Sequence, residues 1–336
     1  MNATVLGDGA WGTTLALLLH ANGHSVTLWG PFPDYVADMM NKRENPRFLP
    51  GVPLPESLTL EPDISRAAAA ADLVVLASPS QYMRGVCEQL KDGGYPADGI
   101  YVNVAKGIEV ETLAPPGRIV RETLGDLRYA ALCGPSHAEE VSQHVPTAIV
   151  AASADAATAE AVQDAFMNAS FRVYTSLDPV GVELGAALKN VFALAAGICD
   201  GIGFGDNSKA ALITRGIVEM ARLGKALGGK RETFAGLSGV GDLIVTCSSK
   251  HSRNRRFGEE LGKGLDLAEV KRAMGMVVAE GVKTCRSAYR LARQVDVSTP
   301  IIDQVYATLY EKKAPRQAAH DLMTREGKRE SLELET

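Results

Sequence analysis

One lysine stands in the most apolar segment of the chain, where an ammonium group is costly unless it is paired or used. This residue is Lys189, and residues 182–199 around it are almost wholly Ala, Leu, Val, Gly and Ile. A helix that is apolar on every side belongs in the centre of a domain. A surface lysine that extends its ammonium to water is the ordinary alternative, but apolar residues surround Lys189 on all sides of the helical wheel. We therefore expect Lys189 to carry the chemical step.

A carboxylate and a basic cluster are the other groups with clear chemistry. Asp242 stands among apolar residues, so we expect a buried cationic partner, and Lys189 is available; a plain helix cap is the alternative. The segment Ser252, Arg253, Asn254, Arg255 and Arg256 opens a helix, where arginine forks and unpaired N–H groups can form a phosphate site. A solvated basic face is an equally good interpretation of this cluster.

Composition limits the class of protein. The longest uncharged run of the apolar segment, residues 190–199, has about half of the ~20 residues that a membrane span needs. The N-terminus has no basic region followed by an apolar one, so we expect no signal peptide. A net charge of −5 gives no general attraction to nucleic acid or anionic membranes. The five cysteines form no zinc or disulfide pattern. We expect a cytoplasmic protein with free thiols and no metal, nucleic-acid partner or membrane span.

The N-terminal residues follow a dinucleotide-binding pattern. Gly7, Gly9 and Gly12 stand between a short strand at 3–6 and an apolar helix at 13–21, and a second strand follows at 25–29. Glycines let the backbone approach a pyrophosphate, and the helix N-terminus offers unpaired N–H groups. In this context of strand, turn, helix and strand, the pattern predicts NAD or NADP binding.

The second strand does not indicate which dinucleotide is bound. An NAD enzyme usually has an acid about 20 residues after the glycines, bonded to the ribose 2′-hydroxyl. Gly30 and Pro31 occupy that place here, and the first acid is Asp34. No arginine stands at this turn to hold a 2′-phosphate. We therefore expect both NADH and NADPH to support turnover.

The elements that must position these groups fall into two classes. Up to residue 178, strands alternate with helices. A proline-rich connection at 46–62 interrupts this alternation, and further strands are expected after it at 72–77, 100–104, 129–133, 147–152 and 171–174. Lys106 and Ser136 follow two of these strands, where ligands gather in a parallel sheet. Helical periodicity dominates afterwards, at 182–199, 208–227, 233–237, 256–261, 267–274, 284–294 and 299–310. We predict a Rossmann-like, doubly wound, mostly parallel α/β domain at 1–178 and an all-helical domain at 179–336.

Six ordered motifs carry a family resemblance. They are GDGAWGTTLA (7–16), NVAKGIE (103–109), GPSHAEE (134–140), LKNVFALAAGICDGIGFGDNSKAALITRG (188–216), GVGDLIVTC (239–247) and SRNRRFG (252–258). With these motifs the chain resembles bacterial NAD(P)-dependent glycerol-3-phosphate dehydrogenases over essentially its full length. The resemblance implies that Lys189 is the general acid/base of the reaction. The resemblance is compatible with a homodimer but does not determine the oligomeric state.

The resemblance also implies binding residues. Substrate would contact Lys106, Gly134, Ser136, Lys189, Asp242, Ser252, Arg253 and Asn254. Cofactor would contact Gly7, Gly9, Ala10, Trp11, Gly12, Lys106, Ala138, Arg253, Val278 and Glu280. Many members have a histidine or arginine near the adenosine, where this chain has Pro31. The segment VVAEG at 277–281 has one residue more than the commoner VVEG.

The implied reaction is reduction of dihydroxyacetone phosphate to sn-glycerol 3-phosphate, the glycerol backbone of phospholipids. A related dehydrogenase of a hydroxy acid or sugar acid is the alternative among enzymes, and it predicts activity on a carboxylate substrate. A dinucleotide-sensing regulator is the alternative outside enzymes. It predicts cofactor binding without turnover and leaves Lys189 unexplained.

Overall fold

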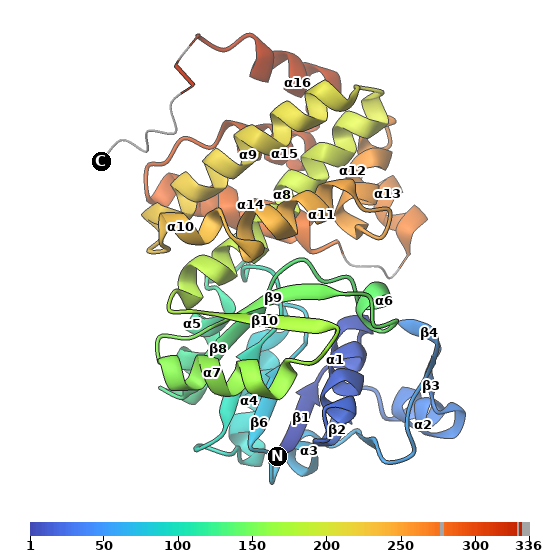
Figure 1. The fold of residues 1–336 in the computed structure, drawn as a ribbon. Helices are drawn as coiled ribbons and strands as arrows, with labels where there is room; N and C mark the ends of the chain where they lie inside the picture. The colour runs from blue at the N-terminus through green and yellow to red at the C-terminus, as the bar shows by residue number, and fades with distance from the viewer. Residues whose placement is uncertain (276–278, 328, 331–336) are drawn as a thin grey trace. The chain divides into compact units, whose positions relative to one another are not determined.

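The computed structural model describes residues 1–275, 279–327 and 329–330. The chain divides into an N-terminal unit (Met1–Lys106 with Ala114–Pro179) and a C-terminal unit (Gly107–Leu113 with Val180–Thr336). Figure 1 draws the first mainly in blue and green and the second mainly in yellow to red. The predicted change of class, from α/β to helical, is confirmed.

Among the residues described, eight strands form one sheet in the N-terminal unit, in the order β10-β9-β8-β7-β6-β1-β2-β5. They are β1 (Asn2–Leu6), β2 (Ser25–Trp29), β5 (Thr59–Glu61), β6 (Leu73–Leu76), β7 (Ile100–Asn103), β8 (Arg128–Cys133), β9 (Thr147–Ala152) and β10 (Phe171–Ser176). Neighbouring strands are parallel except β8 and β9, which are antiparallel. The predicted mostly parallel sheet is therefore present.

Helices cover both faces of this sheet because side chains alternate along each strand. In β6, Leu73 and Val75 join one apolar core, and Val74 and Leu76 join the other. The first core contains α1 (Ala10–Ala21), α2 (Pro33–Lys42), α6 (Ala138–Val141) and α7 (Ala156–Phe166), and the second contains α3 (Ile64–Ala68), α4 (Met83–Gly93) and α5 (Pro116–Leu124). This is the doubly wound arrangement that the sequence predicted.

The expected proline-rich connection at 46–62 contains strands, and the prediction was wrong on this point. β3 (Glu44–Asn45) and β4 (Leu49–Pro53) form an antiparallel two-stranded ribbon, and β5 adds to the edge of the large sheet. Proline lacks the N–H that a central strand needs, but an edge strand tolerates it. Proline content therefore concealed these short strands.

Helices make up the C-terminal unit. They are α8 (Pro179–Ile202), α9 (Asp206–Ala226), α10 (Arg231–Phe234), a π-helical turn η1 (Leu237–Gly241), α11 (Asp242–Ser248), α12 (Arg253–Gly262), α13 (Leu267–Met274), α14 (Glu280–Gln294), α15 (Pro300–Tyr310) and α16 (Pro315–Met323). The structure shows no strand in the described part of this unit.

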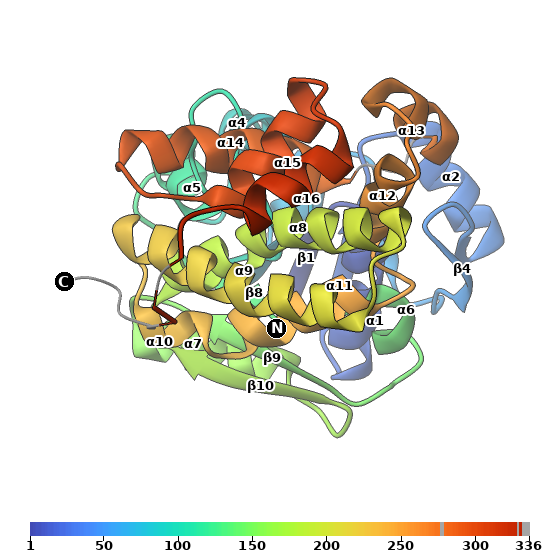
Figure 2. The same ribbon diagram turned by 90° about the horizontal axis from the view of Figure 1, so that it is seen from above.

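The helix α8 runs through the middle of the C-terminal unit (Figures 1 and 2). Every residue from Gly181 to Ile198 is buried. Length and composition alone would let α8 cross a membrane, but 94% of its most apolar window is buried inside the protein. It is the core helix that the sequence predicted, and Lys189 is only 5% exposed within it.

Glycines let α12 pack directly against α8. A Cβ on Gly197 would lie 1.9 Å from the carbonyl oxygen of Arg255, and a Cβ on Gly258 would lie 2.0 Å from that of Leu194. These distances are far below any real contact, so neither position accepts a side chain. The start of α12 is thereby fixed against the core helix.

Residues 107–113 belong with the helices, whereas the sequence placed them in the N-terminal domain. Ile108 is fully buried in the helical core. Ser287 on α14 donates to the carbonyl oxygens of Ile108 at 3.2 Å and Glu109 at 3.3 Å. A sequence-local pattern does not reveal such a distant partner.

A buried glutamate on α9 caps the start of α15. The two carboxylate oxygens of Glu219 accept the N–H groups of Ile301 at 3.0 Å and Ile302 at 2.9 Å. The pKa of Glu219 is raised to about 7, chiefly by burial and to a smaller extent by Asp303, although the two N–H bonds and Arg222 act to lower it.

This geometry predicts a pH-dependent stability. The folded-state pKa of Glu219 lies above its ordinary value of 4.5, so its stabilising contribution is complete below pH 4.5 and is lost as pH rises through 7. We expect the free energy of unfolding of the wild type to fall by about 3 kcal/mol relative to Glu219→Gln over this range. Denaturant titrations of both proteins at both ends of the range measure the difference. The same pH dependence in both would contradict it.

Candidate active site

The glycine loop between β1 and α1 fits a dinucleotide. Gly7 has φ +135°, and a Cβ on Gly12 would lie 1.9 Å from the carbonyl oxygen of Gly7, so both positions require glycine. A Cβ on Gly9 would meet nothing within 4 Å, which leaves open space at the N-cap of α1. Thr13 makes the first intrahelical hydrogen bond, to Gly9, at 2.9 Å. The preceding N–H groups, those of Ala10, Trp11 and Gly12, are the ones that a helix start offers to phosphate.

Lys106 and Ser136 come together after the neighbouring strands β7 and β8. Lys106 Nζ donates to the carbonyl oxygen of Gly134 at 2.7 Å and to Ser136 Oγ at 3.4 Å. Ser136 Oγ donates to the same carbonyl oxygen at 2.9 Å. The buried side chain of Asn103 bonds the backbone of Ala105 and shapes the turn before the lysine. The Lys106 ammonium group and the Ser136 hydroxyl group therefore lie close together in the N-terminal unit, at the ends of neighbouring strands.

Ala138 was predicted as a cofactor contact, and it is buried at the start of the short helix α6. Its carbonyl oxygen accepts from Thr14 Oγ1 at 3.4 Å, so α6 contacts α1 directly behind the glycine loop.

Lys189 forms a buried ion pair with Asp242, as the sequence predicted. Lys189 Nζ donates to Asp242 Oδ1 at 2.6 Å and to Thr246 Oγ1 at 2.6 Å. The side chains of the two charged residues are 7% and 2% exposed. Sequence reasoning missed Thr246, although its spacing of four residues from Asp242 places both on one face of α11. Two fixed acceptors therefore orient the ammonium group.

A cysteine beside this ion pair does not compete as a base. Cys247 follows Thr246 and is fully buried. Burial raises the pKa of its thiol to about 12, and Lys189 lowers it only in part. The thiol stays protonated and acts as a small apolar side chain.

The start of α12 contains both structural and exposed groups. Ser252 caps the helix by accepting the N–H of Arg255 at 3.2 Å. Asn254 is buried and donates from Nδ2 to Asn190 Oδ1 at 2.8 Å. Arg255 pairs with Asp200, with a distance of 2.7 Å between Nε and Oδ2.

Arg253 differs from these neighbours because it is exposed.

Asn254 also accepts, through Oδ1, the N–H of Gly281 at 2.9 Å. The residue next to Gly281, the predicted cofactor contact Glu280, is half-buried at the start of α14. Asn254 thus ties the start of α12 to the start of α14. Val278 lies outside the described residues.

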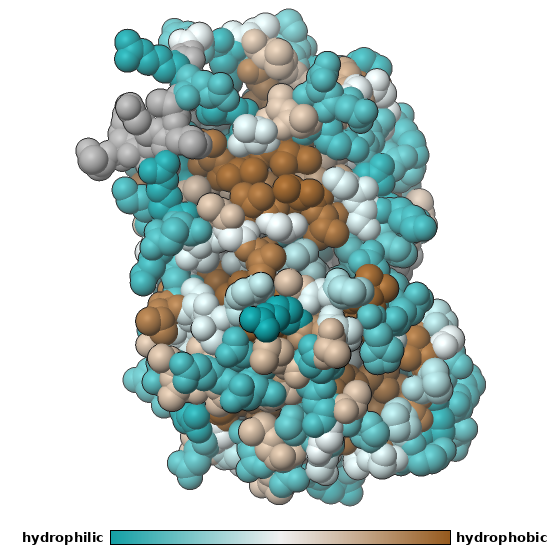
Figure 3. Space-filling view, viewed as in Figure 1, coloured by the Kyte–Doolittle hydropathy of each residue, from teal (hydrophilic) through white to brown (hydrophobic). Residues whose placement is uncertain are grey.

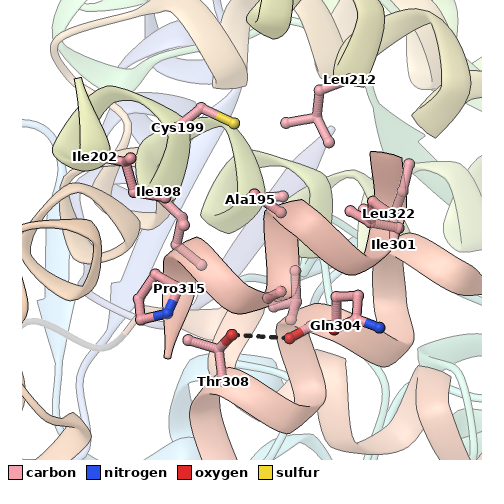
Figure 4. A pocket seen from close by; sticks show the side chains of 13 residues that line it. Ala195, Ile198, Cys199, Ile202, Leu212, Ile301, Gln304, Thr308, Pro315 and Leu322 are labelled. Carbon is pink, nitrogen blue, oxygen red and sulfur yellow. Dashed lines mark hydrogen bonds between the residues drawn. The ribbon is translucent and has the colours of Figure 1, made fainter. Parts of the chain in front are cut away.

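An apolar pocket is a separate feature of the C-terminal unit (Figure 4). It is lined from α8, α9, α15 and α16 by residues that include Ile198, Leu212, Ile301 and Leu322. Gln304 Oε1 is buried without a hydrogen-bond partner among the residues described. Among the residues that the structure describes, no charged side chain lines this pocket, so it offers no ionised group to a substrate or a phosphate.

Comparison with known proteins matches both halves of the chain. Residues 2–159 match the N-terminal family model of NAD-dependent glycerol-3-phosphate dehydrogenase, and residues 178–320 match the C-terminal model. A glycerol-3-phosphate dehydrogenase [NAD(P)+] of Chlorobium phaeobacteroides is 50% identical over 98% of this chain and 99% of its own. The enzyme of the same name from Geobacter metallireducens is 52% identical over 97% and 98%.

A solved structure agrees. The crystal structure of glycerol-3-phosphate dehydrogenase from Coxiella burnetii has a TM-score of 0.93 and 37% identity, covering 96% of this chain and 99% of its own. The resemblance that the six motifs indicated is confirmed over nearly the whole length. The chain therefore belongs to the NAD-dependent glycerol-3-phosphate dehydrogenase family, whose members are oxidoreductases that use NAD(P).

Proposed function

We propose that this protein interconverts dihydroxyacetone phosphate and sn-glycerol 3-phosphate with NAD(P)H, and that Lys189 is the general acid/base. The observation that supports this most is the buried Lys189, held by Asp242 and Thr246 at 2.6 Å each. A buried ammonium group with two fixed partners is suited to hold a proton at one defined atom.

The proposed mechanism divides the work among the residues of the chain. When bound, the nicotinamide supplies the hydride that carbon C2 of the ketone accepts. The Lys189 ammonium donates its proton to the oxygen on C2 during reduction, and the neutral amine takes it back during oxidation. The ammonium charge also stabilises the negative charge that develops on this oxygen. Asp242 and Thr246 keep the lysine oriented.

The phosphate of the substrate needs a different set of groups. Arg253 is exposed at the first position of α12, a ten-residue helix. A guanidinium fork beside helical N–H groups matches the geometry of a phosphate. We assign Arg253 and Asn254 to the phosphate, with Ser252 holding the helix start, and we assign Lys106, Gly134 and Ser136 to the substrate as well.

A steady-state assay tests the proposal. We expect turnover of dihydroxyacetone phosphate with NADH or NADPH, and far less with unphosphorylated dihydroxyacetone or with a 2-oxo acid. Preference for the 2-oxo acid would favour a hydroxy-acid dehydrogenase. Cofactor binding without turnover of any substrate would favour a regulator and contradict the proposal.

The proposal extends to the setting of the enzyme. We place it in the cytoplasm, where it supplies glycerol phosphate for phospholipid synthesis. The five cysteines are free thiols, as is usual in a reducing compartment.

We also propose that the protein forms a homodimer, because the C-terminal unit exposes a continuous hydrophobic area (Figure 3). Sedimentation equilibrium measures the mass in solution, and a monomer at all concentrations contradicts the dimer.

A further inference from the structure

The residue directly after β2 has no side chain. The strand ends at Trp29, and Gly30 follows. In dinucleotide-binding folds, an acid near this point bonds the ribose 2′-hydroxyl of NAD, or a nearby arginine accommodates the 2′-phosphate of NADP. A Cβ on Gly30 would lie 2.4 Å from Asp8 Oδ2 and 2.8 Å from Asp8 Cγ. The carboxyl group of Asp8 therefore fills the place where a side chain of residue 30 would begin.

Packing does not explain this carboxyl group. Asp8 lies between Gly7 and Gly9 in the glycine loop and is 6% exposed. Its Oδ2 atom is buried and has no hydrogen-bond partner in the described part of the chain. The pKa of Asp8 is raised to about 6 by burial, against the smaller lowering effects of a hydrogen bond from its own backbone and of the Arg47 charge. A buried carboxylate oxygen without a hydrogen bond destabilises a fold.

The backbone that carries this group is fixed. Asn45 is fully buried, and its Nδ2 donates to the carbonyl oxygen of Asp8 at 2.7 Å and to Thr13 Oγ1 at 2.7 Å. Tyr35 Oη donates to Asn45 Oδ1 at 2.6 Å. The ribbon of β3 and β4 therefore holds the glycine loop, and with it the position of the Asp8 carboxyl group.

We propose that Asp8 sets the cofactor preference of this enzyme toward NADH. Its carboxylate, supplied from the glycine loop, takes the role of the acid that β2 lacks. It accepts a hydrogen bond from the ribose 2′-hydroxyl of NADH and repels the 2′-phosphate of NADPH. The inference deepens the proposed function, because it concerns the cofactor of the same reaction.

One nearby cation acts in the opposite direction. The Arg47 guanidinium lies 4.9 Å from the centre of the Tyr35 ring and 5.9 Å from that of Phe48. It is exposed to solvent, so water and salt screen its attraction for a 2′-phosphate. A buried charge is screened much less. The carboxylate therefore outweighs the guanidinium.

The test uses nucleotide fragments, so that it does not depend on turnover. Calorimetric titration of the full chain with ADP and with 2′,5′-ADP compares ribose with 2′-phosphoribose directly. We expect the wild type to bind ADP at least about 10-fold more tightly, the low end for a hydrogen bond to a charged group. Asp8→Asn keeps the shape and removes the charge, so the ratio should fall to near one, mainly through tighter binding of 2′,5′-ADP.

Arg47→Gln is the matched control, and it should keep or increase the preference for ADP. Asp8→Ala is the second variant in case the asparagine form does not fold, and melting curves of each variant establish folding. The ratio of kcat/KM for NADH and NADPH should change in parallel with the binding ratio.

Equal binding of both nucleotides by the wild type, or an unchanged ratio in Asp8→Asn and Asp8→Ala, would overturn the proposal. Tighter binding of 2′,5′-ADP would overturn it and assign the 2′-position to Arg47. Binding of neither nucleotide would overturn it and contradict the glycine-loop site. Failure of Lys189 as the acid/base would leave both titrations unchanged, so the two proposals fail separately.

Discussion

Replacement of Lys189 with methionine is expected to lower kcat by about 10²–10⁴-fold, the usual contribution of a positioned acid or base. Methionine is similar in length and suits an apolar helix, so the change opens no large cavity. It removes the proton donor for the alkoxide and the charge that stabilises the developing oxyanion. Steady-state kinetics with dihydroxyacetone phosphate measure the loss.

The ion pair between Lys189 and Asp242 alters the expected effect of Lys189→Met on the stability of the protein. From the sequence alone, methionine in an apolar helix should preserve or raise the melting temperature. The Asp242 side chain is only 2% exposed, and the substitution removes the ammonium group that forms the ion pair with this buried carboxylate. Breaking one partner of a buried pair costs about 3–5 kcal/mol. We therefore expect a lower melting temperature for Lys189→Met, and recovery when Asp242→Asn is added.

Cofactor binding separates a chemical loss from a structural one. The glycine loop belongs to the N-terminal unit, so NADH should bind the Lys189→Met variant as tightly as it binds the wild type. The kinetic assay is done well below the melting temperature of the variant. A fall in kcat of less than about tenfold, below the range for acid–base catalysis, would mean that Lys189 is not the acid/base. Lys106 would then be the next candidate.

Replacement of Arg253 with alanine should raise KM for dihydroxyacetone phosphate by about 10- to 150-fold, since a hydrogen bond to a charged group contributes roughly 1.5–3 kcal/mol. The loss should be far smaller with unphosphorylated dihydroxyacetone, which has no phosphate for the arginine to contact. Comparison of KM for the two substrates isolates this contact.

A neighbouring arginine provides the control. Arg256 is also exposed on α12, and Arg256→Ala removes the same charge from the same helix. We expect little change in KM for either substrate with this variant. Arg255 is unsuitable because it pairs with Asp200. Equal losses on both substrates in Arg253→Ala would remove Arg253 from the phosphate site.

Local patterns in the sequence were enough to predict the architecture. The apolar run around Lys189 indicated a buried helix because a helix without a polar face must be covered on all sides. The glycines with their flanking strand and helix indicated the cofactor loop because this combination of strand, glycine turn and helix is local in the sequence. Hydrophobic periodicity, which depends only on residues that are close in the chain, indicated strands that alternate with helices. This alternation predicted a mostly parallel sheet.

Contacts between distant residues required the tertiary structure. Thr246 on α11 joins the Lys189–Asp242 pair through a hydrogen bond to a lysine that lies 57 residues away in the chain. Residues 107–113 belong with the helices because Ser287 holds them there. A periodic pattern contains no information about a partner far along the chain.

The cofactor site shows this difference most clearly. The sequence determined that strand two ends without an acid, which left the choice between NADH and NADPH open. The fold brings the carboxyl group of Asp8 to Gly30, 2.4 Å from where a Cβ would stand. Only the tertiary structure shows this, because Asp8 comes after β1 and Gly30 comes after β2, and the Asp8 carboxyl group fits in this space only if residue 30 has no side chain.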